Sequence, residues 1–181
     1  MLPLFAATIF LAATLLFVVE PMAAKLILPL LGGSPAVWNT CMVFFQAMLL
    51  GGYLAAHLLS RLSIRLQSIV YLVLLCGPIL ASSVFHRLIV ASPRELAEPA
   101  PNSPISWALL ALMFMVGAPF FVLSAAAPLL QRWFAATTHR SAKDPYFLYA
   151  ASNAGSLLGL LGYPLFIEPW LTLSSQRRWW S

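Results

Sequence analysis

The sequence predicts an all-α protein that crosses a membrane about five times, and two features of its composition carry that prediction. Of its 181 residues, 61% are apolar and only 8% carry a formal charge, with a mean hydropathy of +0.89. An ordinary soluble domain has roughly 45–50% apolar and roughly 25% charged residues. The charges are also clustered, and the uncharged gaps between them match membrane helices of roughly 20 residues. These features exclude a soluble globular domain, and we expect residues 1–181 to form a single transmembrane domain.

Two membrane helices are expected before the first pair of arginines. Residues 1–19 and 26–60 carry no charge, which predicts helices at about 3–31 and 37–59. The turn Gly32-Gly33-Ser34-Pro35 separates them, because glycine and proline interrupt helices. The first segment lacks the basic start of a cleaved signal peptide, so we expect it to be a permanent helix.

Three further helices fill the remaining gaps between charges, at about 67–85, 105–131 and 146–168. The connection 86–104 has no apolar periodicity and is rich in proline, so we expect an extended surface loop; its prolines are Pro93, Pro99, Pro101 and Pro104. The apolar runs are unbroken, whereas the strands of a membrane barrel alternate in polarity, so strands are not expected.

The basic residues predict an orientation and not a nucleic-acid partner. The sequence has ten Lys and Arg residues and five Asp and Glu residues, which gives a net charge of +5, but the basic residues form no continuous run. The loops 60–66 and 132–144 hold five basic residues, and the loops on the other side hold four; the five are Arg61, Arg65, Arg132, Arg140 and Lys143. Cytoplasmic loops carry the excess of basic residues, so we expect the N-terminus inside and the C-terminus outside.

Two stretches of the chain resemble each other. The spacing from Pro35 to Gly52-Tyr53 equals the spacing from Pro145 to Gly162-Tyr163, and Pro-Leu-Leu at 29–31 recurs at 128–130. This repeat pairs helix 3–31 with helix 105–131, and helix 37–59 with helix 146–168. The partners are offset by three helices, so the two halves would be inverted in the membrane, as in many transporters. Such a repeat lacks its last helix here; chance similarity among Leu, Gly and Pro is the alternative.

The sequence contains no catalytic motif. A dinucleotide-binding glycine turn, a phosphate-binding loop, a zinc-protease helix and a nucleophile elbow are all missing. Cys41 and Cys76 lie singly in apolar spans, where cysteine acts as a small hydrophobe. We expect interfacial roles for His57, His86 and His139. The sequence therefore predicts a protein that is not an enzyme and has no cofactor and no metal site.

Glu20 and Lys25 are the charged residues that need an explanation. Inside a long first helix, each would cost roughly 2.5–3.5 kcal/mol on insertion scales, and they would form a candidate buried polar site with Gln46 and Asn153 on the second and fifth helices. The alternative is that the apolar span ends near residue 19, with Glu20 in interfacial water and Lys25 snorkelling. The polar residues of the second and fifth helices can be explained in two ways: they form interhelical hydrogen bonds, or they line a cavity.

A stripe of small residues predicts close helix packing. Ala151, Gly155 and Gly159 are spaced four apart, which places them on one face of the fifth helix. We expect this face to pack against the second helix or against a helix of a partner protein.

The sequence resembles the N-terminal membrane region of membrane-fused spermidine-synthase-like proteins. The resemblance covers nearly the whole chain and rests on these strings: Glu20-Pro21-Met22-Ala23-Ala24-Lys25, Gly32-Gly33-Ser34-Pro35-Ala36-Val37-Trp38-Asn39-Thr40, Phe44-Phe45-Gln46, Gly52-Tyr53, Ala127-Pro128-Leu129-Leu130-Gln131-Arg132-Trp133-Phe134, Asp144-Pro145-Tyr146-Phe147-Leu148-Tyr149-Ala150-Ala151-Ser152-Asn153 and Glu168-Pro169. The resemblance implies half of a major facilitator fold, in a bacterial cytoplasmic membrane. In that family a soluble aminopropyltransferase-like domain follows the membrane region, and this sequence contains no such domain.

Three functions are compatible with these observations. The first is a non-catalytic accessory or scaffold subunit that packs in the bilayer against other membrane proteins or itself. The second is a half-transporter for polyamines or another cation, which would need a dimer to enclose a cavity. The third is the membrane subunit of a separate aminopropyltransferase. We expect the first.

Overall fold

The computed structural model describes residues 2–89 and 103–180, and these residues form helices and turns with no strand among them. Side chains are described for 2–77 and 103–176. The helices are α1 (Leu2–Ile27), η1 (Leu28–Leu31), α2 (Pro35–Leu59), α3 (Ile64–Ile89), α4 (Pro104–Leu112), η2 (Met113–Gly117), α5 (Ala118–Ser124), α6 (Ala126–Ala135), η3 (Arg140–Lys143), α7 (Tyr146–Gly162), η4 (Tyr163–Ile167), α8 (Glu168–Trp170) and α9 (Leu173–Trp180). The all-α prediction is therefore confirmed for the described residues.

Four segments of the described chain are long and apolar enough to cross a membrane: Leu2–Leu31, Pro35–Leu59, Pro104–Ala135 and Tyr146–Trp170. Their length and composition identify an integral membrane protein. They correspond to the expected helices 3–31, 37–59, 105–131 and 146–168, with ends that differ by a few residues. The expected helix 67–85 lies within α3, whose fully described part, Ile64–Gly77, is apolar but shorter than a span.

The structure differs from the expected boundaries in two places. The loop predicted for 86–104 begins later, because α3 continues through Ile89; residues 90–102 lie outside the described residues. Residues 86–89 contain no glycine or proline that would stop α3 at residue 85. The tail after 168, in which we predicted no helix, contains the helix α9.

The first turn forms as its residues predict. Gly32 and Gly33 both have positive φ, 76° and 63°, a conformation that glycine adopts without steric cost. The Ser34 side chain then accepts a hydrogen bond from the Val37 backbone N–H at 3.4 Å, with Pro35 at the first helical position of α2. This turn ends the first span and starts the second.

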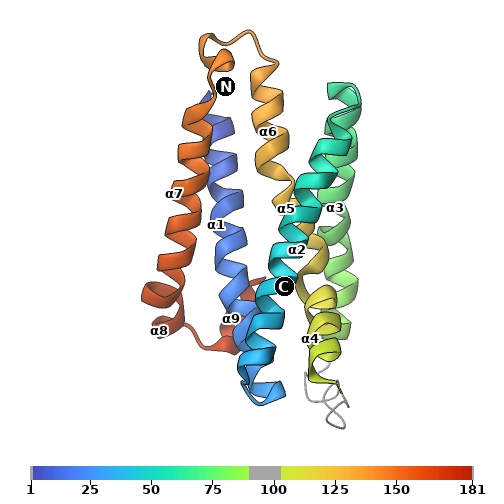
Figure 1. The fold of residues 1–181 in the computed structure, drawn as a ribbon, viewed down its shortest axis with the longest axis vertical. Helices are drawn as coiled ribbons and strands as arrows, with labels where there is room; N and C mark the ends of the chain where they lie inside the picture. The colour runs from blue at the N-terminus through green and yellow to red at the C-terminus, as the bar shows by residue number, and fades with distance from the viewer. Residues whose placement is uncertain (1, 90–102, 181) are drawn as a thin grey trace.

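The helices pack in two extended pairs beside one another (Figure 1). α7 runs along α1, and α2 runs along the span formed by α4 and α5. α3 lies on the far side of α5 from α1, while α9 contacts α1 near the lower end of α1 in the view of Figure 1. A central apolar core joins α1, α2 and α4–α5, where Phe45 and Phe120 stack with ring centroids 5.0 Å apart.

The small-residue stripe of α7 lies against α1 and not against α2. A Cβ atom at Gly155 would collide with the Phe10 carbonyl oxygen, and one at Gly159 would lie 2.7 Å from the Thr14 carbonyl oxygen. Ala151 on the same stripe is half-buried. The spacing of small residues indicates a close approach but carries no information on which helix approaches, and here the approaching helix is the first.

The second helix pair has its own close contact. A Cβ atom at Gly52 of α2 would overlap the Ser124 side chain and lie 2.9 Å from the Phe121 carbonyl oxygen. The Ser124 hydroxyl donates to the Phe121 carbonyl oxygen at 2.7 Å. Each pair of neighbouring spans thus has a glycine at its contact.

Candidate functional site

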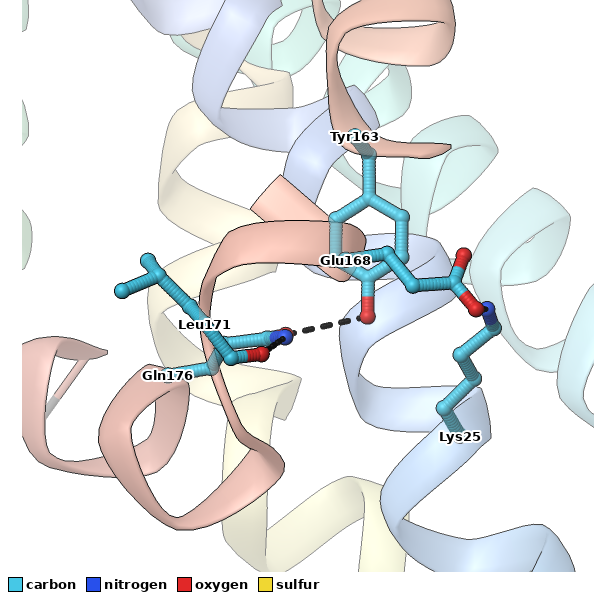
Figure 2. A network of polar contacts seen from close by, with 5 residues as sticks. All are labelled: Lys25, Tyr163, Glu168, Leu171 and Gln176. Atoms are coloured by element: carbon cyan, nitrogen blue, oxygen red, sulfur yellow. Dashed lines mark hydrogen bonds and ion pairs between the residues drawn. The ribbon is translucent and has the colours of Figure 1, made fainter. Parts of the chain in front are cut away.

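A group of polar side chains joins the end of α1 to the segment that follows α7 (Figure 2). Lys25, in the last turn of α1, forms an ion pair with Glu168, the first residue of α8. A cation in the last turn of a helix is also favoured by the helix dipole. The side chains of Lys25 and Glu168 are 34% and 44% exposed, so solvent screens the pair at this edge of the bundle.

Tyr163 extends this group into the bundle. Its ring is 1% exposed, and the Lys25 ammonium nitrogen lies 5.5 Å from the ring centroid, within reach of a cation–π interaction. The Tyr163 hydroxyl donates a hydrogen bond to Oε1 of Gln176 at 3.0 Å. Gln176 is 4% exposed, and its Nε2 donates to the Leu171 carbonyl oxygen at 2.8 Å. Every polar group of this corner therefore has a partner within the chain.

The side chains of this corner are of four chemical kinds. It contains an ammonium, a carboxylate, a phenol and an amide, but no serine, cysteine or histidine with an adjacent base. Among the described residues, no three His, Cys, Asp or Glu side chains are close enough to hold a metal ion. The corner can hold α1, α7, α8 and α9 together.

The structure does not bring the four predicted polar-site residues together. Glu20 and Lys25 are half-buried on α1, whereas Gln46 on α2 and Asn153 on α7 are exposed on the outside of the bundle. The partner of Lys25 is Glu168, which we did not predict as a site residue. A signal for it was present in the sequence: Lys25 precedes the first turn and Glu168 ends the fifth helix, so both lie on the same side of the predicted topology.

Exposed polar side chains follow the outer faces of α2 and α7. On α2, Asn39, Gln46 and Tyr53 are exposed and spaced seven residues apart, so they share one face. On α7, Tyr149 and Asn153 are exposed and spaced four apart. Within the described part of the chain, Gln46 and Asn153 have no hydrogen-bond partner for their side chains.

A second polar group lies at the opposite end of the bundle, around the start of α3. Gln67 is fully buried; its Nε2 donates to the Leu62 carbonyl oxygen at 2.7 Å, and its Oε1 accepts from Trp133 Nε1 at 2.9 Å. Arg132 donates to the Ser60 carbonyl oxygen at 2.7 Å, which ties α6 to the end of α2. Tyr71 packs edge-on against Trp133 and donates to the Val122 carbonyl oxygen at 3.3 Å. From the sequence we predicted only loops with basic residues in this region.

The remaining candidate residues have ordinary surroundings. Cys41 is buried and Cys76 is exposed, and both are free thiols. His57 and His139 are exposed at helix ends. His86 belongs to the part of α3 whose side chains lie outside the description.

No protein family model, curated protein or solved structure matches the chain. The geometry therefore supplies the basis for a functional proposal.

Proposed function

We propose that this chain is a non-catalytic membrane module, an accessory or scaffold subunit that packs in the bilayer against another membrane protein. The observation that carries the proposal is the exposure of Gln46 and Asn153 within two membrane-length helices. Gln46 lies near the middle of α2, and Asn153 lies in the first half of α7. Lipid tails offer no hydrogen bonds to such groups.

A partner protein would satisfy these amides. Interhelical hydrogen bonds in membranes contribute about 0.6 kcal/mol each, so a set of them orients a contact between helices without making it very strong. The faces of α2 and α7 that carry Asn39, Gln46, Tyr53, Tyr149 and Asn153 are the surfaces on which a partner would rest. The half-exposed ion pair of Lys25 and Glu168 holds the helices that present one of these faces.

We also propose a half-major-facilitator-like arrangement built on an inverted repeat. The repeat exchanges the first with the fourth predicted helix, and the second with the fifth. The repeat thus relates α1 to the α4–α5 span and α2 to α7. It predicts that the packing of α7 on α1 has a counterpart, the packing of α2 on the α4–α5 span, and both contacts are present in the bundle. This agreement supports the arrangement. The location that we propose for it is a bacterial cytoplasmic membrane.

The orientation proposal is an N-terminus on the cytoplasmic side. Arg132 bonds to Ser60, so the loops that hold Arg61, Arg65, Arg140 and Lys143 lie at the same end of the bundle. This end is also the end at which α1 begins (Figure 1). Gathered basic residues support a cytoplasmic location for it.

Photo-crosslinking in native membranes tests the packing proposal. A photoreactive phenylalanine analogue replaces Gln46 or Asn153 in separate variants, and Leu110 in a control. Leu110 is 60% exposed on α4, a helix that carries none of these polar residues. We expect discrete protein adducts at positions 46 and 153, and lipid adducts at 110. Lipid adducts alone at all three positions would contradict the proposal.

One observation favours a second function, a half-transporter for polyamines or another cation. Glu20 lies within a membrane-length helix, is half-buried and has no ion-pair or hydrogen-bond partner among the described residues. Ionisable side chains inside spans frequently mark ion pathways. Protection of a cysteine at position 17, one helical turn before Glu20, from thiol reagents by added spermidine, and loss of that protection in Glu20→Gln, would support transport. Equal labelling with and without spermidine would contradict transport and leave packing against a partner as the proposed function.

A further inference from the structure

Two short segments at opposite ends of the bundle share one pattern of side-chain and backbone bonds. Leu62-Ser63-Ile64-Arg65-Leu66-Gln67 precedes and begins α3, and Leu171-Thr172-Leu173-Ser174-Ser175-Gln176 precedes and begins α9. Each starts with leucine, continues with a hydroxyl residue and an aliphatic residue, and ends with glutamine. The two segments lie outside the parts of the repeat that the sequence alone revealed.

The hydrogen bonds of the two glutamines match one by one. Nε2 of each donates to the carbonyl oxygen five residues earlier, at 2.7 Å for Gln67 to Leu62 and at 2.8 Å for Gln176 to Leu171. The backbone N–H of each donates to the carbonyl oxygen of the hydroxyl residue, Ser63 or Thr172, at 2.9 Å. The carbonyl oxygen of Leu62 or Leu171, just before the helix, thus accepts a hydrogen bond from a glutamine side chain in the first two turns of that helix.

Each glutamine also accepts a hydrogen bond from an aromatic side chain of another helix. Trp133 of α6 donates to Gln67 at 2.9 Å, and Tyr163 of η4 donates to Gln176 at 3.0 Å. Both glutamines are almost fully buried, at 0% and 4% exposure. Burial of an amide is costly unless its donor and acceptor are both used, and here both are used in the same way.

We propose that Leu62–Gln67 and Leu171–Gln176 are two copies of one device, a glutamine anchor that fixes the start of a helix to the bundle. α9 is then the counterpart of the first turns of α3, and it belongs to the bundle instead of lying in the headgroup layer as a surface helix. Its contacts with α1 (Figure 1) agree with that position. The anchor joins α9 to the Lys25–Glu168 corner through Tyr163, as Trp133 joins α3 to α6 (Figure 2). This inference is independent of the proposed packing against a partner.

Spin labels at matched positions test the equivalence. In a background with alanine at positions 41 and 76, single cysteines replace Arg65 and Ser174, which are both exposed and lie two residues before the glutamines. We expect Gln67→Met to increase the mobile component of the spectrum at position 65, and Gln176→Met to increase it at position 174. The control is Gln46→Met, the same change at an exposed glutamine without a partner, which is expected to alter neither spectrum.

Two milder variants provide the same test if a methionine variant fails to fold. Trp133→Phe and Tyr163→Phe each remove only the donor to one glutamine and keep an aromatic ring. We expect smaller increases of mobility in the same places. An unchanged spectrum at position 174 in both Gln176→Met and Tyr163→Phe would overturn the proposal, whatever the label at 65 reports.

Discussion

The carbonyl oxygen of Phe10 occupies the space that a side chain at Gly155 would need. The Thr14 hydroxyl lies beside it: this group donates to the Phe10 carbonyl oxygen at 2.8 Å and lies 3.2 Å from the Gly155 carbonyl oxygen. The backbones of α1 and α7 therefore approach as closely as small residues permit. This contact holds together the two helices that end in the Lys25–Glu168 corner.

We predict that Gly155→Ala lowers the free energy of unfolding in detergent by about 1–3 kcal/mol, because the new methyl group must displace backbone atoms of α1. Gly162→Ala is the matched control in the same helix, since a Cβ atom there has no neighbour within 4 Å. The control is expected to be neutral or up to about 1 kcal/mol stabilising, from the higher helix propensity of alanine. Equal denaturant unfolding curves for the two variants would show that α7 does not rest on α1.

The sequence predicted the helices well wherever local chemistry determines their ends. Gly32, Gly33, Ser34 and Pro35 end the first span and start the second by φ preference and capping, effects that need no information from distant residues. α9 was missed because no long uncharged run follows Glu168. Tyr163 donates a hydrogen bond to Gln176 of α9, a contact that forms only after folding.

The candidate site was predicted only in part, for a related reason. Lys25 stood out because a charge inside an apolar run is visible in the sequence. Its pairing with Glu168, and the exposure of Gln46 and Asn153, depend on how α2 and α7 are rotated about their axes. Rotation is set by packing, such as the contact of Gly159 with Thr14. Periodicity therefore indicates which residues share a face but does not indicate what that face meets.

A charge exchange tests the ion pair at the corner. Glu168→Gln is expected to lower stability by about 0.2–1 kcal/mol, the usual range for a pair that solvent reaches. Lys25→Glu combined with Glu168→Lys is expected to recover part of that loss, because the pair reforms but an acid at the end of α1 opposes the helix dipole. Unfolding in detergent at low and high salt measures the effect, which salt should weaken.

Glu20→Gln serves as the control for the charge exchange, since Glu20 has no ion-pair partner among the described residues. Its effect on stability is expected to be independent of salt. A double variant no more stable than Lys25→Glu alone would show that the two side chains do not interact.

We predict that the purified chain does not transfer an aminopropyl group to putrescine. The sequence has no glycine turn of the kind that holds a nucleotide cofactor. Among the described acids, Glu20 and Glu168 lie on different helices, and Glu168 is paired with Lys25. The measurement is product formation from putrescine and decarboxylated S-adenosylmethionine. Turnover that a single substitution in this chain abolishes would contradict the prediction.

The last prediction concerns the depth of Glu20. α1 continues without a break through Pro21 to Ile27, and Met22, Ala23 and Ala24 are buried just after Glu20. If α1 left the membrane at Glu20, these three side chains would be expected to face water, but they pack against α2 and α4. We therefore expect Glu20 to lie within the membrane-spanning part of α1 and not at its end.

A cysteine scan through 17–28, in a background lacking Cys41 and Cys76, distinguishes these positions for Glu20. A water-soluble thiol reagent should fail to label through residue 24 and should label a control cysteine at Gly32, which is exposed in the turn. Uniform labelling from position 20 onward would place the end of the span near residue 19 and Glu20 in water. Protection at position 20 establishes depth alone, and a transport role further requires spermidine-dependent protection at position 17 with Glu20 intact.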